Sequence, residues 1–215
     1  MRKIRKNKTK KRGIIMNQVA MFQLTYGLFV LSAKRGEKDN ACIVNTVQQV
    51  TTTPNRITVA VNKANYTHDM IVETGMMNVS ILSEETPFEV FKRFGFQTGA
   101  TTDKFADCDY YTRAENGLVY LSKYANAYIS AKVVASYDLG THTLFVADVT
   151  DADVLSNVPS VTYAYYHKNI KPKPEKTKAK GWRCKICGYV YEGEVLPEDF
   201  ICPICKHGAF DFERI

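Results

Sequence analysis

Four cysteines in the last part of the sequence are spaced as metal ligands. They form two C-x-x-C pairs, Cys184 with Cys187 and Cys202 with Cys205. Four thiolates from two such turns make a tetrahedral sulfur site, which is typical of zinc or of a single iron ion. The spacing therefore predicts a metal centre and leaves the identity of the metal open.

The residues around these cysteines are aromatic and acidic rather than basic. The aromatic residues of this segment are Trp182, Tyr189, Tyr191, Phe200, Phe210 and Phe212. A domain this small needs such apolar mass together with a metal ion to fold. We expect residues 182–215 to form a small metal-binding domain, and the lack of a basic cluster argues against a nucleic-acid-binding zinc ribbon.

The positive charge of the chain lies outside its expected folded parts. The formal net charge of the 215 residues is +7, but the basic residues are concentrated in residues 1–15 and 168–181. The first segment is predicted to be a disordered tail or an untranslated extension, since Met16 offers a second start. The second is a Lys- and Pro-rich linker. Because residues 16–167 and 182–215 are both net acidic, we expect no nucleic-acid partner.

The sequence also predicts where the protein works. It contains no apolar run long enough to cross a bilayer and no pattern of a secretory signal peptide. Six cysteines without such a signal indicate reduced thiols and a metal site rather than disulfides. We therefore expect a cytoplasmic protein that does not enter a membrane.

Residues 16–167 read as a mainly β domain with helical excursions. Short runs rich in Val, Ile, Thr and aromatic residues predict strands at 27–33, 41–50, 56–61, 77–82, 127–137 and 142–149. Two helices are expected, one capped by Thr67 and ending at Gly75, the other capped by Thr86 and ending at Gly95. Many strands and few helices favour a closed β-barrel.

Polar residues collect where one predicted strand runs into the first helix. The residues concerned are Lys63, Asn65, Thr67 and His68. A helix N-terminus beside a lysine, a hydroxyl and an imidazole can bind a phosphate group. Ordinary turn and capping chemistry would give the same pattern, so composition alone leaves both interpretations open.

The tail resembles a rubredoxin of the short form that is found appended to other proteins. The resemblance covers residues 182–212 and rests on "WRCKICGYVYEGE" and "PEDFICPIC". It implies a mononuclear iron that cycles between ferric and ferrous states. The implied ligands are Cys184, Cys187, Cys202 and Cys205.

Residues 17–167 resemble the flavin reductase-like, FMN-binding split-barrel family. The matching stretches are "NACIVNTVQQVT", "VAVNKANYTHDMI", "MNVSIL", "GTHTLFVADV" and "TYAYYHK". The resemblance implies FMN as cofactor and a homodimer. It implies that the isoalloxazine and ribityl groups are approached by Asn45, Thr46, Val47 and Gln48. It assigns the phosphate to Lys63, Asn65, Thr67 and His68, and it makes His142 a candidate catalytic residue at the flavin edge.

The two parts together resemble the high-molecular-weight rubredoxins. That resemblance implies an FMN-dependent oxidoreductase that passes electrons from NAD(P)H through FMN to the iron. The expected acceptor is a protein partner such as a flavo-diiron reductase of nitric oxide or dioxygen.

Two other functions remain open from the sequence. One is a flavin reductase or ferric reductase whose rubredoxin is an accessory. The other is a non-enzymatic zinc-ribbon binding protein. The choice between NADH and NADPH, the final acceptor, and transfer within or between subunits are also left open.

Overall fold

A seven-stranded antiparallel sheet forms the body of the protein. The computed structural model describes residues 20, 23–172, 181–186, 188–203 and 208–215. The strand order of the sheet is β2-β1-β5-β8-β9-β4-β3. Its strands are β1 (Phe29–Arg35), β2 (Lys38–Val44), β3 (Gln48–Thr52), β4 (Asn55–Asn62), β5 (Met76–Leu82), β8 (Ala125–Asp138) and β9 (His142–Val154).

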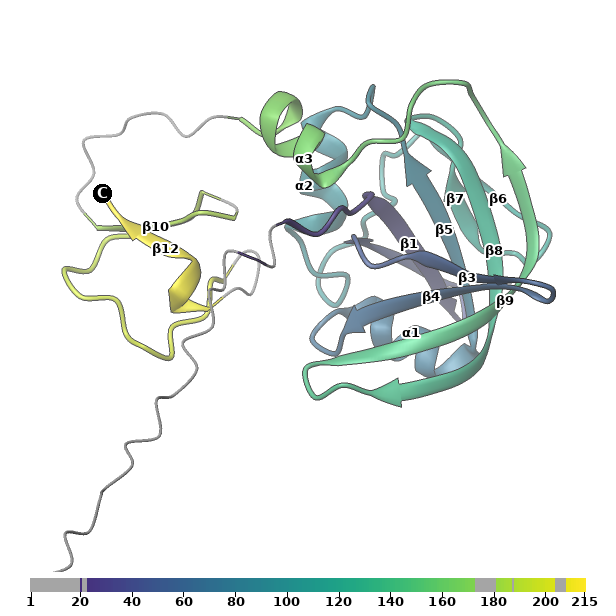
Figure 1. The fold of residues 1–215 in the computed structure, drawn as a ribbon, viewed down its shortest axis with the longest axis horizontal. Coiled ribbons are helices and arrows are strands. Elements are labelled where there is room, and N and C mark those ends of the chain that lie inside the picture. The colour runs from purple at the N-terminus through teal and green to yellow at the C-terminus, as the bar shows by residue number, and fades with distance from the viewer. Residues whose placement is uncertain (1–19, 21–22, 173–180, 187, 204–207) are drawn as a thin grey trace, which may run out of the picture.

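The two edge strands of this sheet are consecutive in sequence. Only residues 45–47 join β2 to β3, so the opposite edges of the sheet must come close together. Figure 1 shows the long strands β8 and β9 curving around the body of the domain. The predicted barrel with helical excursions is therefore confirmed. Each predicted run contains a strand, but the run expected at 41–50 is divided into β2 and β3 by residues 45–47.

Alternation along the strands gives the sheet a core on each side. Leu31 and Ala33 of β1 belong to one apolar cluster, whereas Val30 belongs to the other. Helix α1 (Tyr66–Thr74) adds Met70 and Ile71 to the first cluster. Helix α2 (Phe88–Gly95) adds its apolar face to the second cluster through Val90, Phe91 and Phe94.

Both helices occur where the sequence predicted them, but their N-caps differ. The N-cap of α1 is Asn65 rather than Thr67, and that of α2 is Pro87 rather than Thr86. Each threonine hydroxyl serves a tertiary contact instead: Thr86 Oγ1 lies 2.7 Å from the carbonyl oxygen of Ser83 and 2.8 Å from that of Tyr124. Gly75 ends α1 in the left-handed conformation, as predicted, with φ of 65°.

Shorter elements complete the barrel domain. Residues 111–113 and 119–121 form a hairpin, β6 (Tyr111–Arg113) and β7 (Val119–Leu121). The domain closes with α3 (Tyr163–Tyr165) and a π-helix, η2 (Tyr166–Ile170). Regular structure thus extends to Ile170, inside the segment 168–181 that was predicted to be linker. Among the described residues, no helix is long and apolar enough to cross a membrane.

The tail has a sheet and a small core of its own. Its strands are β10 (Trp182–Cys184), β11 (Val190–Tyr191) and β12 (Phe212–Arg214), with the short helix η3 (Ala209–Asp211) before β12. The strand order is β11-β10-β12. Cys184, Cys202 and Phe212 are buried at its centre, with aromatic side chains such as Phe200 packed against them.

Candidate functional site

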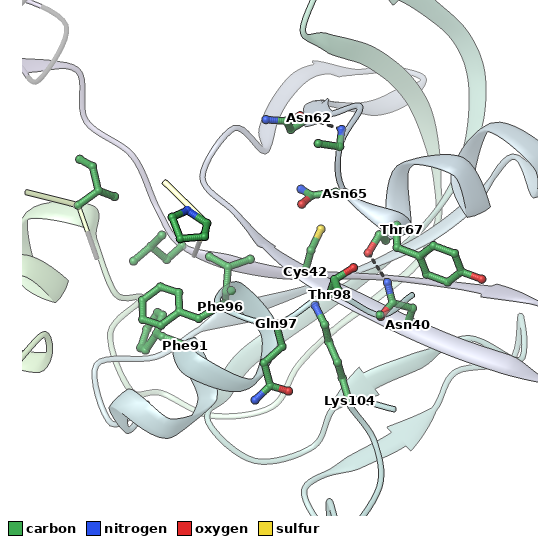
Figure 2. A pocket seen from close by; sticks show the side chains of 18 of the residues that line it. Asn40, Cys42, Asn62, Asn65, Thr67, Phe91, Phe96, Gln97, Thr98 and Lys104 are labelled. Atoms are coloured by element: carbon green, nitrogen blue, oxygen red, sulfur yellow. Dashed lines mark hydrogen bonds between the residues drawn. The ribbon is translucent and has the colours of Figure 1, made fainter. Parts of the chain in front are cut away.

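A cavity of about 670 Å³ opens beside β2 and the start of α1. One wall comes from β2 and from the turn between β4 and α1, and it includes Asn40, Cys42, Asn65 and Thr67. Figure 2 shows this polar side opposite Phe91 and Phe96, which belong to α2 and the loop that follows it. The cavity therefore has an apolar, aromatic side and a polar side, as sites for aromatic cofactors do.

The start of α1 presents backbone donors at this cavity. The first N–H groups of a helix have no acceptor within the helix. The N-cap residue Asn65 makes no side-chain capping bond to them, and Asn65, Tyr66 and Thr67 all line the cavity. These unsatisfied donors and the positive end of the helix dipole suit a phosphate group.

A buried lysine supplies positive charge on the same polar side. Lys104 is only 3% exposed, and its Nζ donates to the carbonyl oxygens of Ala41 (2.9 Å) and Phe94 (3.1 Å). Burial lowers the pKa of Lys104. Among the residues that the structure describes, no carboxylate forms an ion pair with it. An ammonium group held only by neutral carbonyls can still attract an anionic ligand.

Asn40, on β2, contacts the start of α1 and lies close to the loop that follows α2. Its Nδ2 donates to Thr67 Oγ1 at 2.8 Å, while its buried Oδ1 has no hydrogen-bond partner in the described part of the chain. A Cβ on Gly99 would lie 2.0 Å from this oxygen. Residue 99 therefore has to be glycine for the loop to approach the wall this closely.

Cys42 lies between Thr67 and Lys104 in this wall. Burial raises the pKa of its thiol, although the Thr67 hydroxyl and the Lys104 charge oppose that change. The thiol is therefore neutral at physiological pH, and Cys42 packs in the wall as a small buried side chain.

Only some of the predicted phosphate ligands reach the cavity. Asn65 and Thr67 line it. Lys63 Nζ instead lies 2.7 Å from Asp138 Oδ1. His68 is 8% exposed, and its two ring nitrogens contact Asp69 (2.9 Å) and Thr143 (2.8 Å).

The segment expected at the flavin ring lies in the link from β2 to β3. The hydroxyl of Thr46 donates to the carbonyl of Ala60 at 2.7 Å, and Val47 packs on the core of the first cluster. Asn45, Thr46, Val47 and Gln48 are not among the residues that line the cavity in the described chain. His142 is also outside that lining; its Nδ1 contacts Thr141 Oγ1 at 2.9 Å, and partial burial lowers its pKa.

Other lining residues carried little or no signal in the sequence. Asn40 and Lys104 look like ordinary polar residues of a strand and a loop, because nothing local shows that the fold buries them. Residues 95–99, at the end of α2 and in the loop after it, also line the cavity, as does Tyr166 of the stretch "TYAYYHK".

The structure describes two of the four predicted metal ligands. Cys184 is 1% and Cys202 0% exposed, and both belong to the core of the tail. The backbone N–H of Gly188 donates to the carbonyl of Cys184 at 2.9 Å, which closes the first C-x-x-C turn. Cys187 and Cys205 lie outside the described residues. Two buried cysteines, each beginning a C-x-x-C pair, fit the predicted four-thiolate centre.

Residues 21–173 match the family model described as the flavin reductase like domain. The chain belongs to this family. Residues 182–213 match a second model, that of the rubrerythrin, rubredoxin-like domain. The barrel fold is therefore that of a flavin-binding family, and the rubredoxin-like domain implies iron.

Curated relatives repeat this division of the chain. The protein is 37% identical to the high molecular weight rubredoxin of Moorella thermoacetica, over 93% of this chain and 100% of the relative. It is 40% identical to the ferric-chelate reductase (NAD(P)H) of Archaeoglobus fulgidus, over 75% of this chain and 95% of that protein. The first relative spans both domains, and the predicted resemblance is confirmed.

Solved structures give the same fold for the barrel. The NADH:FAD oxidoreductase of Streptomyces globisporus superposes with a TM-score of 0.60 at 18% identity, covering 66% of this chain and 84% of that one. The flavoredoxin of Methanosarcina acetivorans gives 0.55 at 22% identity, covering 60% and 69%. These likenesses concern the fold of a flavin reductase-like barrel.

Proposed function

We propose that the protein is an FMN-dependent oxidoreductase that takes electrons from NAD(P)H and passes them to a mononuclear iron in its tail. One observation carries this proposal. The same chain has a cavity with aromatic residues and helix N–H donors that suit a phosphate, and a tail whose cysteines are spaced for one metal ion. Flavin-based electron transfer follows from the family, and the route from donor to iron is the proposed part.

The polar side of the cavity would hold the phosphate of FMN. The first turn of α1 offers its N–H groups, and Asn65 and Thr67 lie at this turn. A phosphate carries close to two negative charges, so helix donors and hydroxyl groups both stabilise it. Lys104 adds positive charge to the same wall and would favour a more negative ligand.

The apolar side of the cavity would hold the flavin ring. Phe91, Phe96 and Tyr166 line it, and the first and last are packed with ring centroids 4.5 Å apart. Aromatic side chains bind a planar ring through a large contact area and keep water from it. We propose that these three residues shape the site for the flavin ring.

The other predicted ligands keep the roles proposed for them. Asn45, Thr46, Val47 and Gln48 are proposed to contact the ring and ribityl chain mainly through their backbone, and His142 is proposed at the flavin edge. Lys63 and His68 are weaker candidates for the phosphate because each already has a hydrogen-bonded partner.

The tail would deliver electrons one at a time to a protein acceptor. A flavin accepts electrons in pairs from a nicotinamide, whereas a four-cysteine iron accepts one at a time. The proposed ligands are Cys184, Cys187, Cys202 and Cys205. The proposed acceptor is a flavo-diiron protein that reduces nitric oxide or dioxygen, and the protein is proposed to act as a homodimer.

A visible spectrum with metal analysis tests this proposal. We expect anaerobically purified protein to show flavin bands and ferric-thiolate absorption, and both should bleach on adding an excess of NADH or NADPH. A tail that holds zinc in protein made with ample iron would contradict the relay and favour a zinc-ribbon module. A protein without flavin bands that binds no added FMN would contradict the barrel assignment.

A second candidate function is the reduction of a ferric chelate or of free flavin, with the rubredoxin as an accessory. The 40% identity of the barrel to the relative named ferric-chelate reductase (NAD(P)H) favours it. The variant Cys202→Ser separates the two functions. The relay predicts that it loses electron delivery to a protein acceptor, whereas an accessory tail predicts unchanged turnover of ferric chelates and of the protein acceptor alike.

A further inference from the structure

The cysteine loops of the tail contribute to the wall of the barrel cavity. Ile186 lies inside the first C-x-x-C pair and Pro203 inside the second, and both line the cavity described above. Residues inside a C-x-x-C loop are direct neighbours of the metal ligands. The tail therefore meets the cavity through described residues that lie next in sequence to predicted metal ligands.

A lysine of the barrel domain holds the first of these loops. Lys171 follows η2, and its Nζ donates to the carbonyl oxygens of Lys185 (3.0 Å) and Ile186. Its own backbone N–H donates to the carbonyl of Tyr166 at 2.8 Å. Because Tyr166 also lines the cavity, the lysine is anchored to the wall on which the loop lies.

The chemistry of this contact suits a reversible attachment. Lys171 binds main-chain carbonyls, so it recognises the shape of the loop rather than a particular side chain. A hydrogen bond from a charged donor is stronger than one between neutral groups, yet a single partly exposed lysine cannot make a permanent interface. The apolar contacts through Ile186 and Pro203 add a small area around it.

We infer that Lys171 and the mouth of the barrel cavity form a docking site for the rubredoxin-like domain of the same chain. This inference rests on the proposed function. It identifies the partner that binds at the proposed flavin cavity as the tail of the same chain, which follows residues 168–181 in sequence. A tethered partner has a high effective concentration, so a weak contact is enough for frequent docking. Transfer then runs within one chain rather than between subunits.

Docking also sets an order of events at the cavity. A nicotinamide must reach the flavin ring to deliver its hydride, and docked loops occupy part of the same wall. A bound FMN would supply two electrons and the iron would take one, so one electron would pass in each docking as ferric iron becomes ferrous. Two dockings, each followed by discharge of the iron to the acceptor, would return the flavin to its oxidised state and release its protons to water.

Small-angle X-ray scattering on the full-length protein with zinc in the tail tests docking without any redox chemistry. We expect Lys171→Ala to shift the balance from docked to undocked domains by about tenfold and to increase the radius of gyration. Lys168→Ala is the matched control, since Lys168 is an exposed lysine of η2, the element that Lys171 follows. Equal radii for wild type, Lys171→Ala and Lys168→Ala would overturn the docking site.

Electron transfer within the iron-loaded protein gives the second measurement. After photoreduction of the flavin, the rate of iron reduction in wild type should not depend on protein concentration, and Lys171→Ala should lower it by about tenfold. A rate that rises with concentration would show transfer between separate molecules and overturn docking as the route of transfer. If iron is never reduced while Lys171→Ala still expands the zinc protein, docking stands and the proposed relay fails.

Discussion

The barrel cavity and the tail hold their sites with cores of very different size. Two large clusters of buried side chains support the cavity, one on each side of the sheet. In the described part of the tail, the buried core consists of the side chains of Cys184, Cys202 and Phe212, and two of these three are predicted metal ligands. The barrel can therefore fold before it binds its cofactor, whereas the tail depends on its metal for much of its core.

Metal removal should produce the largest effect and should be confined to the tail. We expect Cys202→Ser, or a chelator, to unfold the tail while the melting temperature of the barrel changes by no more than about 2 °C. Trp182 is the only tryptophan of the chain and belongs to β10, so its fluorescence reports the tail alone. Cys108→Ser, in the barrel, is the control. Simultaneous loss of both domains would show that the two cores are not independent.

A substitution at Gly99 should damage the cavity without unfolding the barrel. A methyl group there meets Asn40 Oδ1, so Gly99→Ala must displace the loop or break the bond between Asn40 and Thr67. We expect FMN affinity, measured by fluorescence titration, to fall at least about tenfold, with a stability loss of about 1–3 kcal/mol. Gly95→Ala is the matched control because its Cβ would lie 3.3 Å from Ile43 Cγ1, a milder approach. Equal affinities for the two variants would contradict this account.

Replacing Lys104 should change the cofactor's electron affinity more than its binding. A positive charge in the wall favours the more negative, reduced flavin, so Lys104→Met should lower the flavin potential by about 30 mV for each 1.4 kcal/mol of lost attraction. Because burial lowers the pKa of Lys104, the wild-type advantage should shrink as the pH rises through that pKa and the ammonium loses its proton. Lys92→Met, at an exposed position of α2, should leave the potential unchanged. A difference in flavin potential between Lys104→Met and wild type that grows as the pH rises would contradict this prediction.

The smallest effect is expected at Lys63, which the sequence assigned to the phosphate and the structure pairs with Asp138. We expect Lys63→Ala to change FMN affinity by no more than about twofold, whereas Thr67→Val should weaken it more. The ion pair lowers the pKa of Asp138 below its ordinary 3.8, so its small stabilisation is present above that pH and lost as the pH falls through the lowered pKa. The free energy of unfolding of wild type and of Lys63→Ala, measured as the pH is lowered, gives this stabilisation. A large affinity loss in Lys63→Ala would restore the phosphate role.

Local patterns predicted the parts of the molecule that depend on local interactions. The strands of the barrel follow from alternating β-branched runs, and the αL glycine at residue 75 follows from helix-ending chemistry. The cysteine spacing predicts the metal site from the sequence alone because a C-x-x-C pair is a local pattern. The caps at Thr67 and Thr86 were assigned wrongly because each hydroxyl forms a tertiary contact that no local pattern reveals.

The cavity depended on contacts between segments far apart in the sequence. Asn40 meets Thr67 across 27 residues, and Lys104 reaches the carbonyl of Ala41 across 63. Their burial results from the way the loop after α2 folds over β2. The same reason explains Lys63, whose partner Asp138 comes from the distant strand β8.

The attachment point of the tail has a mechanical consequence. Gly181 and Ile215 exchange two backbone hydrogen bonds, of 3.2 and 2.9 Å, beside the pairing of β10 with β12. Gly181 has φ of +150°, and a Cβ there would lie 2.3 Å from the carbonyl oxygen of Tyr191, so only glycine fits this corner. Tension transmitted along the chain from the barrel would therefore act first on these two hydrogen bonds, before it reaches the pairing of β10 with β12.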